Sequence, residues 1–463
     1  MSEAAVIPAQ EWLSRAEGYI TDEFKRARLS GAYAVVAGGA VVLEGAVGID
    51  SRTGRPMTPD TPFEIGSVTK SLTALAILQL RDQGLLNLDD PVQRHLPWFR
   101  VADAKASERI TIRHLLSHTS GLSPTSQGVV ARDYDRIWPS IEAGVRELRT
   151  QRLKGEPGTR FAYANMGYAA AGAVVEAVSG RPWAEYIQSE ILDPLGMRHS
   201  AADFSRAHDL QVATPHGWIF GRPAPVGHRA LGPYLAPAGS TTVCSVRDLA
   251  RYALACLGAA PIPKLSPGSL EEAQTGAVKI DENSAYGLGW VEQLTEEGQR
   301  VVWHNGGTEG SASVLMLLPA EGIAVILLCN TATRRLDPLA TNLLAVVRGE
   351  DPKPVEATFE IGKVISLAWM GFMGLSLFLL LWLGLTIRAD LAASTPAGWG
   401  RFVWVTLLAA LPWWMALSLF PNMGAPPLSR LRLWPIDSIL GMGGLLLSSA
   451  LWWIWALVKL IWL

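Results

Sequence analysis

The pattern of hydrophobic and polar positions along the chain changes near residue 360. Beyond it, three long runs carry no charged side chain: residues 364–387, 402–420 and 438–458. At a helical rise of about 1.5 Å per residue, each run can cross about 30 Å of hydrocarbon. Eleven of the 18 tryptophans lie beyond residue 363, and several are near the ends of the runs, as in an aromatic belt. Buried core helices are the alternative, but three such runs in succession favour a membrane domain over residues 364–463 with three transmembrane helices.

The part of the chain before this domain has a different pattern. Residues 349–363 contain charges and prolines and are predicted to be a linker, which leaves residues 1–348 as a separate folded domain. Its apolar periodicity predicts helices and strands, with helices at 10–29 and 336–348, and strands within 31–49 and at 286–294, 300–305, 311–319 and 323–330. Strands at both ends with helices between them predict an α/β (α+β) fold, an antiparallel sheet flanked by helices with a helical insertion.

The insertion begins with a strongly periodic segment. From Ser67 to Gln83, apolar residues recur at spacings of three and four, which predicts an amphipathic helix that stops at Gly84. A mostly helical region then extends to about residue 275. A groove between the sheet and this insertion is a natural place for a functional site.

Composition and charge limit the partners and metal sites that are expected. The formal net charge of −2 gives no basic signal for nucleic acid, so no nucleic-acid partner is expected. The three cysteines, Cys244, Cys256 and Cys329, fit neither a zinc site nor a disulfide framework and are expected to be small buried hydrophobes. The sequence gives no indication of the oligomeric state.

A first candidate for catalysis is the stretch FEIGSVTKSLTA, residues 63–74, in which Ser67 and Lys70 are three apart. Positions i and i+3 share a helix face, so the lysine amine can contact the serine. A serine hydroxyl needs a base to become a good nucleophile, and a lysine with a lowered pKa can supply one. The alternative is a serine N-cap followed by a solvated surface lysine.

Two further segments carry weaker signals. Tyr163 and Asn165 precede an alanine-rich helix, and a tyrosine can relay a proton to a leaving group. Their alternative is a packed aromatic beside a helix cap. In VVWHNGGTEGS, a strand ends in His304-Asn305-Gly306-Gly307, where glycine lets a backbone approach a ligand and direct an N–H at a carbonyl oxygen. A glycine-bearing turn is the alternative there.

Together, the order Ser-x-x-Lys, Tyr-x-Asn, then a basic residue followed by x-Gly resembles the penicillin-recognising serine hydrolases. Within them it is similar to the branch of class C β-lactamases, esterases and D-aminopeptidases. Supporting stretches are ITIRHLLSHTSGL at 110–122, DPLGMRHS at 193–200, PAGSTTVCSVRDLARY at 237–252 and YGLGW at 286–290. The resemblance covers about residues 10–348 and implies a β-lactamase/transpeptidase-like fold.

The resemblance also implies roles for residues. Ser67 is then the acylated nucleophile, and Lys70 is its general base or shares that role with Tyr163. Tyr163 then protonates the leaving group and later activates water. Asn165 is expected to hold the substrate or orient Lys70. The backbone N–H groups of Ser67 and Gly307 are expected to form an oxyanion hole. This chemistry requires no metal and no cofactor.

One position departs from the β-lactamase pattern. A β-lactamase has Lys-Thr-Gly where this chain has His304-Asn305-Gly306. A histidine with an unperturbed pKa near about 6.5 is only partly charged at neutral pH, so it suits a substrate carboxylate less well than a lysine does. We therefore expect peptidase or esterase activity on a less anionic acyl group rather than efficient penicillin hydrolysis.

The addition of three membrane helices resembles the prodrug-activating peptidases of nonribosomal peptide pathways, including the colibactin-maturation type. That resemblance implies a peptidase or amidase that cleaves an N-acyl-D-amino-acid amide from an amphiphilic, acylated precursor near membrane lipid. Glu64, Asn305 and His228 are the candidates for holding the D-amino acid, with His304 beside them. The alternatives are a carboxylesterase, a β-lactamase or DD-peptidase-like enzyme, or a non-catalytic membrane sensor.

The side of the membrane is less constrained. The two loops between the predicted spans carry two arginines each, Arg388 and Arg401 then Arg430 and Arg432, so the positive-inside rule does not decide. No secretory signal is visible in the first 20 residues, which alone predicts a cytoplasmic domain. The resemblance instead implies a multi-pass protein of the cytoplasmic membrane with an outward-facing active site, and this is the expectation that we retain.

Overall fold

The computed structural model describes residues 9–122, 138–203, 207–219, 222–226 and 233–355, and isolated positions between 364 and 385. The predicted membrane spans lie outside the described residues apart from those isolated positions. No helix of the described part is long and apolar enough to cross a membrane. Backbone contacts divide the chain into two units, of which the first holds residues 1–130, 136–216 and 225–359. The main sheet, its helices and the candidate site all lie in this first unit.

One antiparallel sheet of eight strands organises this unit, in the order β2-β1-β12-β11-β10-β9-β8-β7. The strands are β1 (Gly31–Ala37), β2 (Ala40–Val47), β7 (Val278–Lys279), β8 (Ser284–Tyr286), β9 (Val291–Leu294), β10 (Arg300–Gly307), β11 (Ala312–Leu318) and β12 (Ile323–Cys329). Strands from the two ends of the domain meet where β1 pairs with β12, with Gly31 opposite Cys329 and Val36 opposite Ala324. The predicted antiparallel sheet built from both ends is therefore confirmed.

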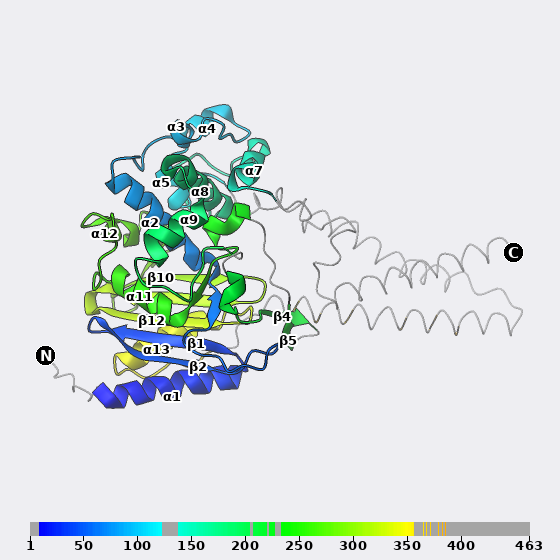
Figure 1. Cartoon of the computed structure of the whole chain (residues 1–463), viewed down its shortest axis with the longest axis vertical. Helices are drawn as coiled ribbons and strands as arrows, with labels where there is room; N and C mark the ends of the chain where they lie inside the picture. Colours follow the sequence, from blue (N-terminus) through cyan, green and yellow to red (C-terminus); the bar gives the residue numbers. More distant parts are fainter. Residues whose placement is uncertain are drawn as a thin grey trace, which may run out of the picture. The chain divides into compact units, whose positions relative to one another are not determined.

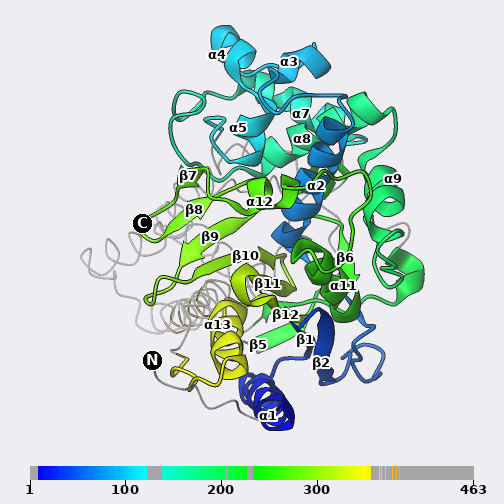
Figure 2. The same ribbon diagram turned by 90° about the vertical axis from the view of Figure 1, so that its left-hand side faces the viewer.

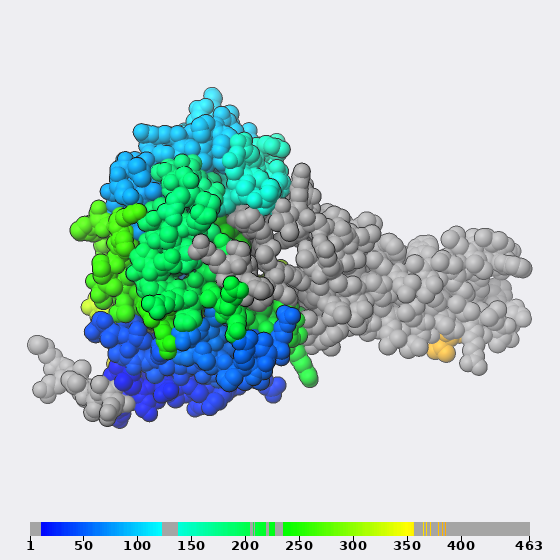
Figure 3. All heavy atoms as spheres, viewed as in Figure 1, coloured from blue at the N-terminus to red at the C-terminus, as the bar shows by residue number. Residues whose placement is uncertain are grey.

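Helices cover both faces of this sheet. The helices α1 (Ala9–Ala27) and α13 (Leu336–Val347) pack on one face, and the insertion between β2 and β7 lies on the other (Figures 1 and 2). Strands β11 and β12 are buried along their whole length because both of their faces are covered. In the space-filling view, the blue N-terminal segment lies directly against the green part of the insertion (Figure 3).

The insertion contains most of the remaining elements. Its helices are α2 (Thr69–Asp82), α3 (Val92–His95), α4 (Ala104–Arg109), α5 (Ile112–Leu116), α7 (Ile141–Val145), α8 (Asn165–Ser179), α9 (Trp183–Ile187), α11 (Val246–Cys256) and α12 (Ser269–Gln274). Short strands, β3 (Pro62–Glu64) with β6 (Val243–Ser245) and β4 (His216–Ile219) with β5 (Arg222–Pro225), form two small sheets. The sequence pattern did not predict these short strands, because runs of three or four residues are too short to show an alternation.

The helix that carries the candidate lysine is central. Every residue of α2 from Thr69 to Leu80 is buried, so the helix is not amphipathic as predicted. The physical reason is that α2 runs between the sheet and the rest of the insertion, so all of its sides are covered. Its buried polar residues, among them Lys70, Thr73 and Gln79, form hydrogen bonds there. The helix ends as predicted: Gly84 has φ +75°, and its N–H donates to the carbonyl of Arg81.

The predicted strand 286–294 is also wrong, because a turn at residues 287–290 divides it into β8 and β9. Gly289 in this turn has φ +83°, and a Cβ there would lie 2.8 Å from the carbonyl oxygen of Lys70. The turn therefore presses against α2 at the candidate lysine, and only glycine fits.

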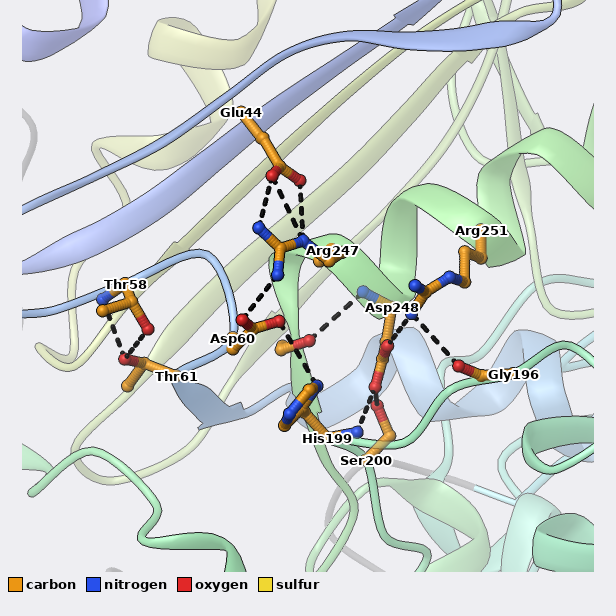
Figure 4. Close-up of polar contacts among 11 residues, drawn as sticks. Glu44, Thr58, Asp60, Thr61, Gly196, His199, Ser200, Arg247, Asp248 and Arg251 are labelled. Carbon is orange, nitrogen blue, oxygen red and sulfur yellow. Dashed lines mark hydrogen bonds and ion pairs between the residues drawn. The ribbon is translucent and has the colours of Figure 1, made fainter.

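A polar network ties the start of α11 to three other segments (Figure 4). Arg247 contacts Glu44 on β2 and Asp60 before β3. The fully buried carboxylate of Asp248 accepts the N–H of His199 at 2.6 Å, the hydroxyl of Ser200 at 2.9 Å and a guanidinium N–H of Arg251 at 2.6 Å. Since a buried charge needs such partners, this network holds α11 and the 196–200 segment in place.

A second carboxylate, that of Asp50, anchors the segment around Thr214. Asp50 accepts the N–H groups of Thr53 at 2.8 Å and Thr214 at 2.7 Å, and also their hydroxyls. Burial acts to raise the pKa of Asp50, but these donors outweigh it and lower the pKa to about 2. Because the carboxylate is favoured in the folded state, its contribution is complete above the ordinary pKa of about 3.9 and is lost as the pH falls towards 2.

We therefore predict that Asp50→Asn lowers the free energy of unfolding by about 2 kcal/mol at neutral pH. The difference from the unsubstituted chain should shrink as the pH falls below about 4, because the unfolded chain then binds a proton at Asp50 that the folded state takes up only near pH 2. Urea unfolding at a series of pH values measures both effects. A difference that stays constant down to low pH would contradict this account of the hydrogen bonds.

Candidate active site

Ser67 lies where a short 3-10 turn, Gly66–Val68, leads into α2. Its side chain caps neither element, so the N-cap alternative is wrong. Gly66 has φ +50°, and a Cβ there would lie 2.6 Å from the backbone nitrogen of Gly307. A Cβ on Gly306 would lie 1.9 Å from the carbonyl oxygen of Ile65. The end of β10 therefore lies directly against the turn that carries Ser67, and glycines permit this approach.

Lys70 is fully buried, which excludes the alternative of a solvated surface lysine. Its Nζ lies 2.8 Å from Ser67 Oγ and donates to the carbonyl oxygen of Ala238 at 2.9 Å. The amine also lies over the ring of Tyr163, 4.9 Å from its centroid. Burial lowers the pKa of Lys70 well below its ordinary range, which favours the neutral amine.

Tyr163 reaches the same oxygen from the segment before α8. Its hydroxyl lies 2.8 Å from Ser67 Oγ and donates to it. Burial raises the pKa of Tyr163 above its ordinary value, so the phenol keeps its proton. A neutral Lys70 then accepts a hydrogen bond from the Ser67 hydroxyl on its lone pair and donates an N–H to the carbonyl oxygen of Ala238. In this assignment each of the three contacts, Tyr163 to Ser67, Ser67 to Lys70 and Lys70 to Ala238, has one donor and one acceptor.

These three residues line or adjoin one pocket, with Ser67, Glu64, Asn165, Gly307, Thr308 and Glu309 among the residues in its wall. The backbone of Gly307 is close to that of Gly66, so its N–H is near the residue that precedes Ser67. Asn165 is the first residue of α8 and does not cap it, and its Oδ1 is buried with no hydrogen-bond partner among the described residues. Asn165 lines the pocket, but this oxygen is itself covered and is not exposed to the pocket.

Glu64 lies in the pocket wall and accepts the hydroxyl of Thr308 at 2.6 Å. The Thr308 oxygen in turn accepts N–H groups of the β10–β11 turn, from Ser311 at 3.0 Å and Gly310 at 3.3 Å. Glu64 thus reaches the pocket as expected, but it also holds the turn that follows Gly307. The remaining candidate, His228, lies outside the described residues.

His304 and Asn305 are brought to opposite faces of β10 because successive side chains of a strand alternate. Asn305 Nδ2 donates to Asp337 on α13 at 2.8 Å, on the face away from Ser67. Asn305 does not line the pocket, so its expected contact with substrate does not fit this placement. The carboxyl of Asp337 is itself mostly buried, and burial raises its pKa.

His304 faces the insertion and is 3% exposed. Its Nδ1 lies 2.5 Å from the carbonyl oxygen of Asn305, which can only accept, so Nδ1 carries the proton and Nε2 accepts the Tyr286 hydroxyl at 2.9 Å. Burial, with repulsion from a protonated Lys70, lowers the pKa of His304 to about 3. The expectation of a partly charged histidine at neutral pH is therefore wrong, because that expectation assumed a solvated ring.

Three residues of this site were missed by the sequence interpretation: His118, Tyr286 and Thr308. His118 and Tyr286 pack against Tyr163. Both lie in stretches that the family resemblance singled out, SHTSGL and YGLGW, but nothing in the residue types indicates that they would meet. Thr308 follows the glycine pair directly, and its turn position was the available signal.

Comparisons with known proteins agree with this geometry. A sequence model described as Beta-lactamase matches residues 14–348. Esterase EstB from Burkholderia gladioli is 30% identical over 376 residues, which cover 70% of this chain and 92% of the esterase. Penicillin-binding protein 4 from Amycolatopsis lactamdurans is 30% identical over 330 residues, 66% of this chain and 84% of that protein.

Two solved structures of SurE have the same fold as this chain. The crystal structure of SurE superposes with a TM-score of 0.62 at 26% identity and covers 76% of this chain and 80% of SurE. The structure of SurE with D-Leu has a TM-score of 0.59 at 27% identity, with 76% and 79% covered.

The chain belongs to the Beta-lactamase family. It is a serine hydrolase of the type that includes β-lactamases, esterases and penicillin-binding proteins. The hypothesis of a non-catalytic sensor is therefore set aside, and the expected β-lactamase-like fold is confirmed.

The neutral state of His304 gives a direct prediction. Because its pKa is lowered to about 3, its ring should not titrate between about pH 5 and 8. We expect one histidine Cε1–H NMR signal, identified by its loss in His304→Asn, to keep its chemical shift across this range. Movement of that signal with a midpoint near about 6.5 would mean that His304 gains a proton at neutral pH.

Proposed function

We propose that this chain is a membrane-anchored peptidase or amidase that cleaves an N-acyl-D-amino-acid amide through an acyl-enzyme on Ser67. The observation that supports it most is the position of Ser67 Oγ, 2.8 Å from both the Lys70 amine and the Tyr163 hydroxyl. A nucleophile with a base and an acid already in place is what acyl transfer requires.

In this proposal, acylation proceeds by transfer of two protons. Ser67 Oγ attacks the amide carbonyl carbon and passes its proton to the neutral Lys70 amine. The N–H groups of Ser67 and Gly307 stabilise the oxyanion. Tyr163 protonates the leaving nitrogen, the C–N bond breaks, and the phenolate that remains is stabilised by the Lys70 ammonium.

Deacylation reverses the proton transfers. The Tyr163 phenolate takes a proton from a water molecule, which attacks the ester carbonyl. When the ester bond breaks, Ser67 recovers its proton from Lys70. The cycle consumes one amide and one water, releases a carboxylic acid and an amine, and returns the enzyme to its starting protonation state.

Two features of the site support a substrate that is an amide and that carries no carboxylate near His304. His304 is neutral, so it offers no fixed cation to an anionic group. Asn165 lines the pocket, and a rotation of its side chain would present Oδ1 to a substrate amide N–H, a donor that an ester lacks. The preference for the D isomer and for an N-acyl group rests on the family resemblance, and SurE, solved with D-Leu, is consistent with it.

A carboxylesterase is the second candidate. The 30% identity to Esterase EstB favours it, and a neutral residue at 304 is compatible with it. The two candidates differ in the leaving group, because an amine must be protonated to depart and an alkoxide depends on this less. Tyr163 retains its proton, so it is the residue that can protonate an amine leaving group, and loss of its hydroxyl should affect amide hydrolysis more than ester hydrolysis.

A matched substrate panel tests the proposal. We expect N-acyl-D-amino-acid amides to be hydrolysed with a kcat/KM at least about 10-fold above their L isomers, as a stereospecific contact would give. The corresponding esters complete the panel. Turnover of the esters with none of either amide isomer would replace the amidase with the carboxylesterase.

The control for this panel is the nucleophile itself. Ser67→Ala should lower kcat by at least about 10³-fold and abolish labelling by a fluorescent fluorophosphonate. Ser189→Ala, a serine that donates to the Glu185 carbonyl away from the pocket, should leave both unchanged. Equal labelling of Ser67→Ala and the unsubstituted chain would exclude Ser67 as the nucleophile.

The membrane part of the proposal is tested separately. The three uncharged runs beyond residue 363 support an anchor in the cytoplasmic membrane, and an odd number of spans puts the two ends of the chain on opposite sides. If the active site faces outward, a reporter fused after residue 463 is expected to be active only in the cytoplasm. Activity of that reporter on the outer side would overturn the outward-facing arrangement.

A further inference from the structure

His118 lies in the SHTSGL stretch, whose role the proposed mechanism does not use. It is 1% exposed and has φ +57°, a left-handed conformation that is strained for a residue with a Cβ. Such strain persists where surrounding contacts determine the conformation, and it is concentrated at functional sites. The contacts of His118 therefore indicate what the conformation serves.

The hydrogen bonds of His118 hold both sides of Tyr163. The His118 carbonyl oxygen accepts the N–H of Ala162 at 2.8 Å. The ring Nδ1 accepts the N–H of Ala164 at 3.1 Å. One residue thus fixes the backbone immediately before and immediately after the tyrosine, which leaves little freedom in the direction of its side chain.

The ring of His118 also packs on the tyrosine itself. The two ring centroids are 4.2 Å apart with an interplanar angle of 38°, and Tyr286 packs on His118 at 4.6 Å. Because Nδ1 accepts a hydrogen bond, the single ring proton of the neutral form is on Nε2. Nε2 has no hydrogen-bond partner among the described residues, so the ring is held by one directional bond and by aromatic packing.

We propose that His118 is a positioning residue that sets the hydroxyl of Tyr163 on Ser67, through the hydrogen bonds to Ala162 and Ala164 and through ring packing. The inference rests on the proposed function in one respect, which is the role of Tyr163 as proton donor and acceptor. His118 does not line the pocket, and its hydrogen bonds go to the backbone beside Tyr163. Its effect on the reaction should therefore pass mainly through the tyrosine.

Two substitutions separate the contacts. His118→Phe keeps a ring against Tyr163 but removes the acceptor for the Ala164 N–H. His118→Asn loses the ring, but its Oδ1 occupies about the place of Nδ1, and asparagine adopts positive φ readily. We expect kcat per fluorophosphonate-labelled serine to fall about 10- to 100-fold in His118→Phe, part of the 10²–10⁴-fold that acid–base catalysis contributes, with KM changed less than about 3-fold. His118→Asn should retain more of kcat than His118→Phe.

A double-mutant cycle with Tyr163→Phe distinguishes positioning from a general structural role. If His118 acts through the hydroxyl, adding His118→Phe or His118→Asn to Tyr163→Phe should cost less than about 3-fold in kcat. An equal loss in both backgrounds would overturn the inference, as would wild-type kcat in His118→Phe. If His118→Phe fails to fold, as thermal unfolding would show, the cycle with His118→Asn decides in the same way.

The failure of this inference can be told apart from failure of the proposed function. If Tyr163→Phe alone keeps the wild-type kcat, the proposed role of Tyr163 is wrong and the inference falls with it. If Tyr163→Phe is impaired while both His118 variants are not, the mechanism stands and only the positioning role is wrong.

Discussion

The structure depends on the burial of one amine without an opposite charge. Lys70 is enclosed by α2, the Ala238 carbonyl and the ring of Tyr163, and among the described residues it forms no ion pair. An ammonium ion in such a place costs several kcal/mol, so the neutral amine is favoured and can act as a base. The burial of α2 from Thr69 to Leu80 and the close glycine turn at Gly289 are the structural requirements of that enclosure.

The two nearby histidines satisfy the same constraint. Burial lowers the pKa of both His118 and His304, and repulsion lowers it further whenever Lys70 is protonated. Three basic groups in one low-dielectric region cannot all be protonated, so the cation that forms at Lys70 during acylation has no competitor. Each histidine is also fixed in one tautomer by a backbone group, His118 by an N–H and His304 by a carbonyl. The charge distribution of the site therefore follows from which groups are buried and which backbone atoms they meet.

The sequence was sufficient where a local pattern and a local structure coincide. Ser67 and Lys70 share a helix turn, and the long apolar strands β11 and β12 are continuous runs, so both could be predicted. Contacts between distant segments could not: the 2.8 Å contact of Tyr163 with Ser67 joins residues 96 positions apart, and the resemblance suggested it where the spacing did not. The charge of His304 required knowledge of burial. The face of Asn305 was available from strand alternation, since it cannot point the same way as His304.

Glu64 shows why a role transferred by resemblance needs the contacts as well. Its carboxylate lies in the pocket wall, as a substrate-binding residue would, yet one oxygen accepts the hydroxyl that holds the β10–β11 turn. A carboxylate has about four lone-pair sites, so one contact does not exclude another. Because the turn begins directly after Gly307, a movement of Glu64 that shifts Thr308 also affects the segment next to the expected oxyanion donor. The pocket wall and the oxyanion geometry are therefore coupled through Thr308, and a substitution at Glu64 changes both together.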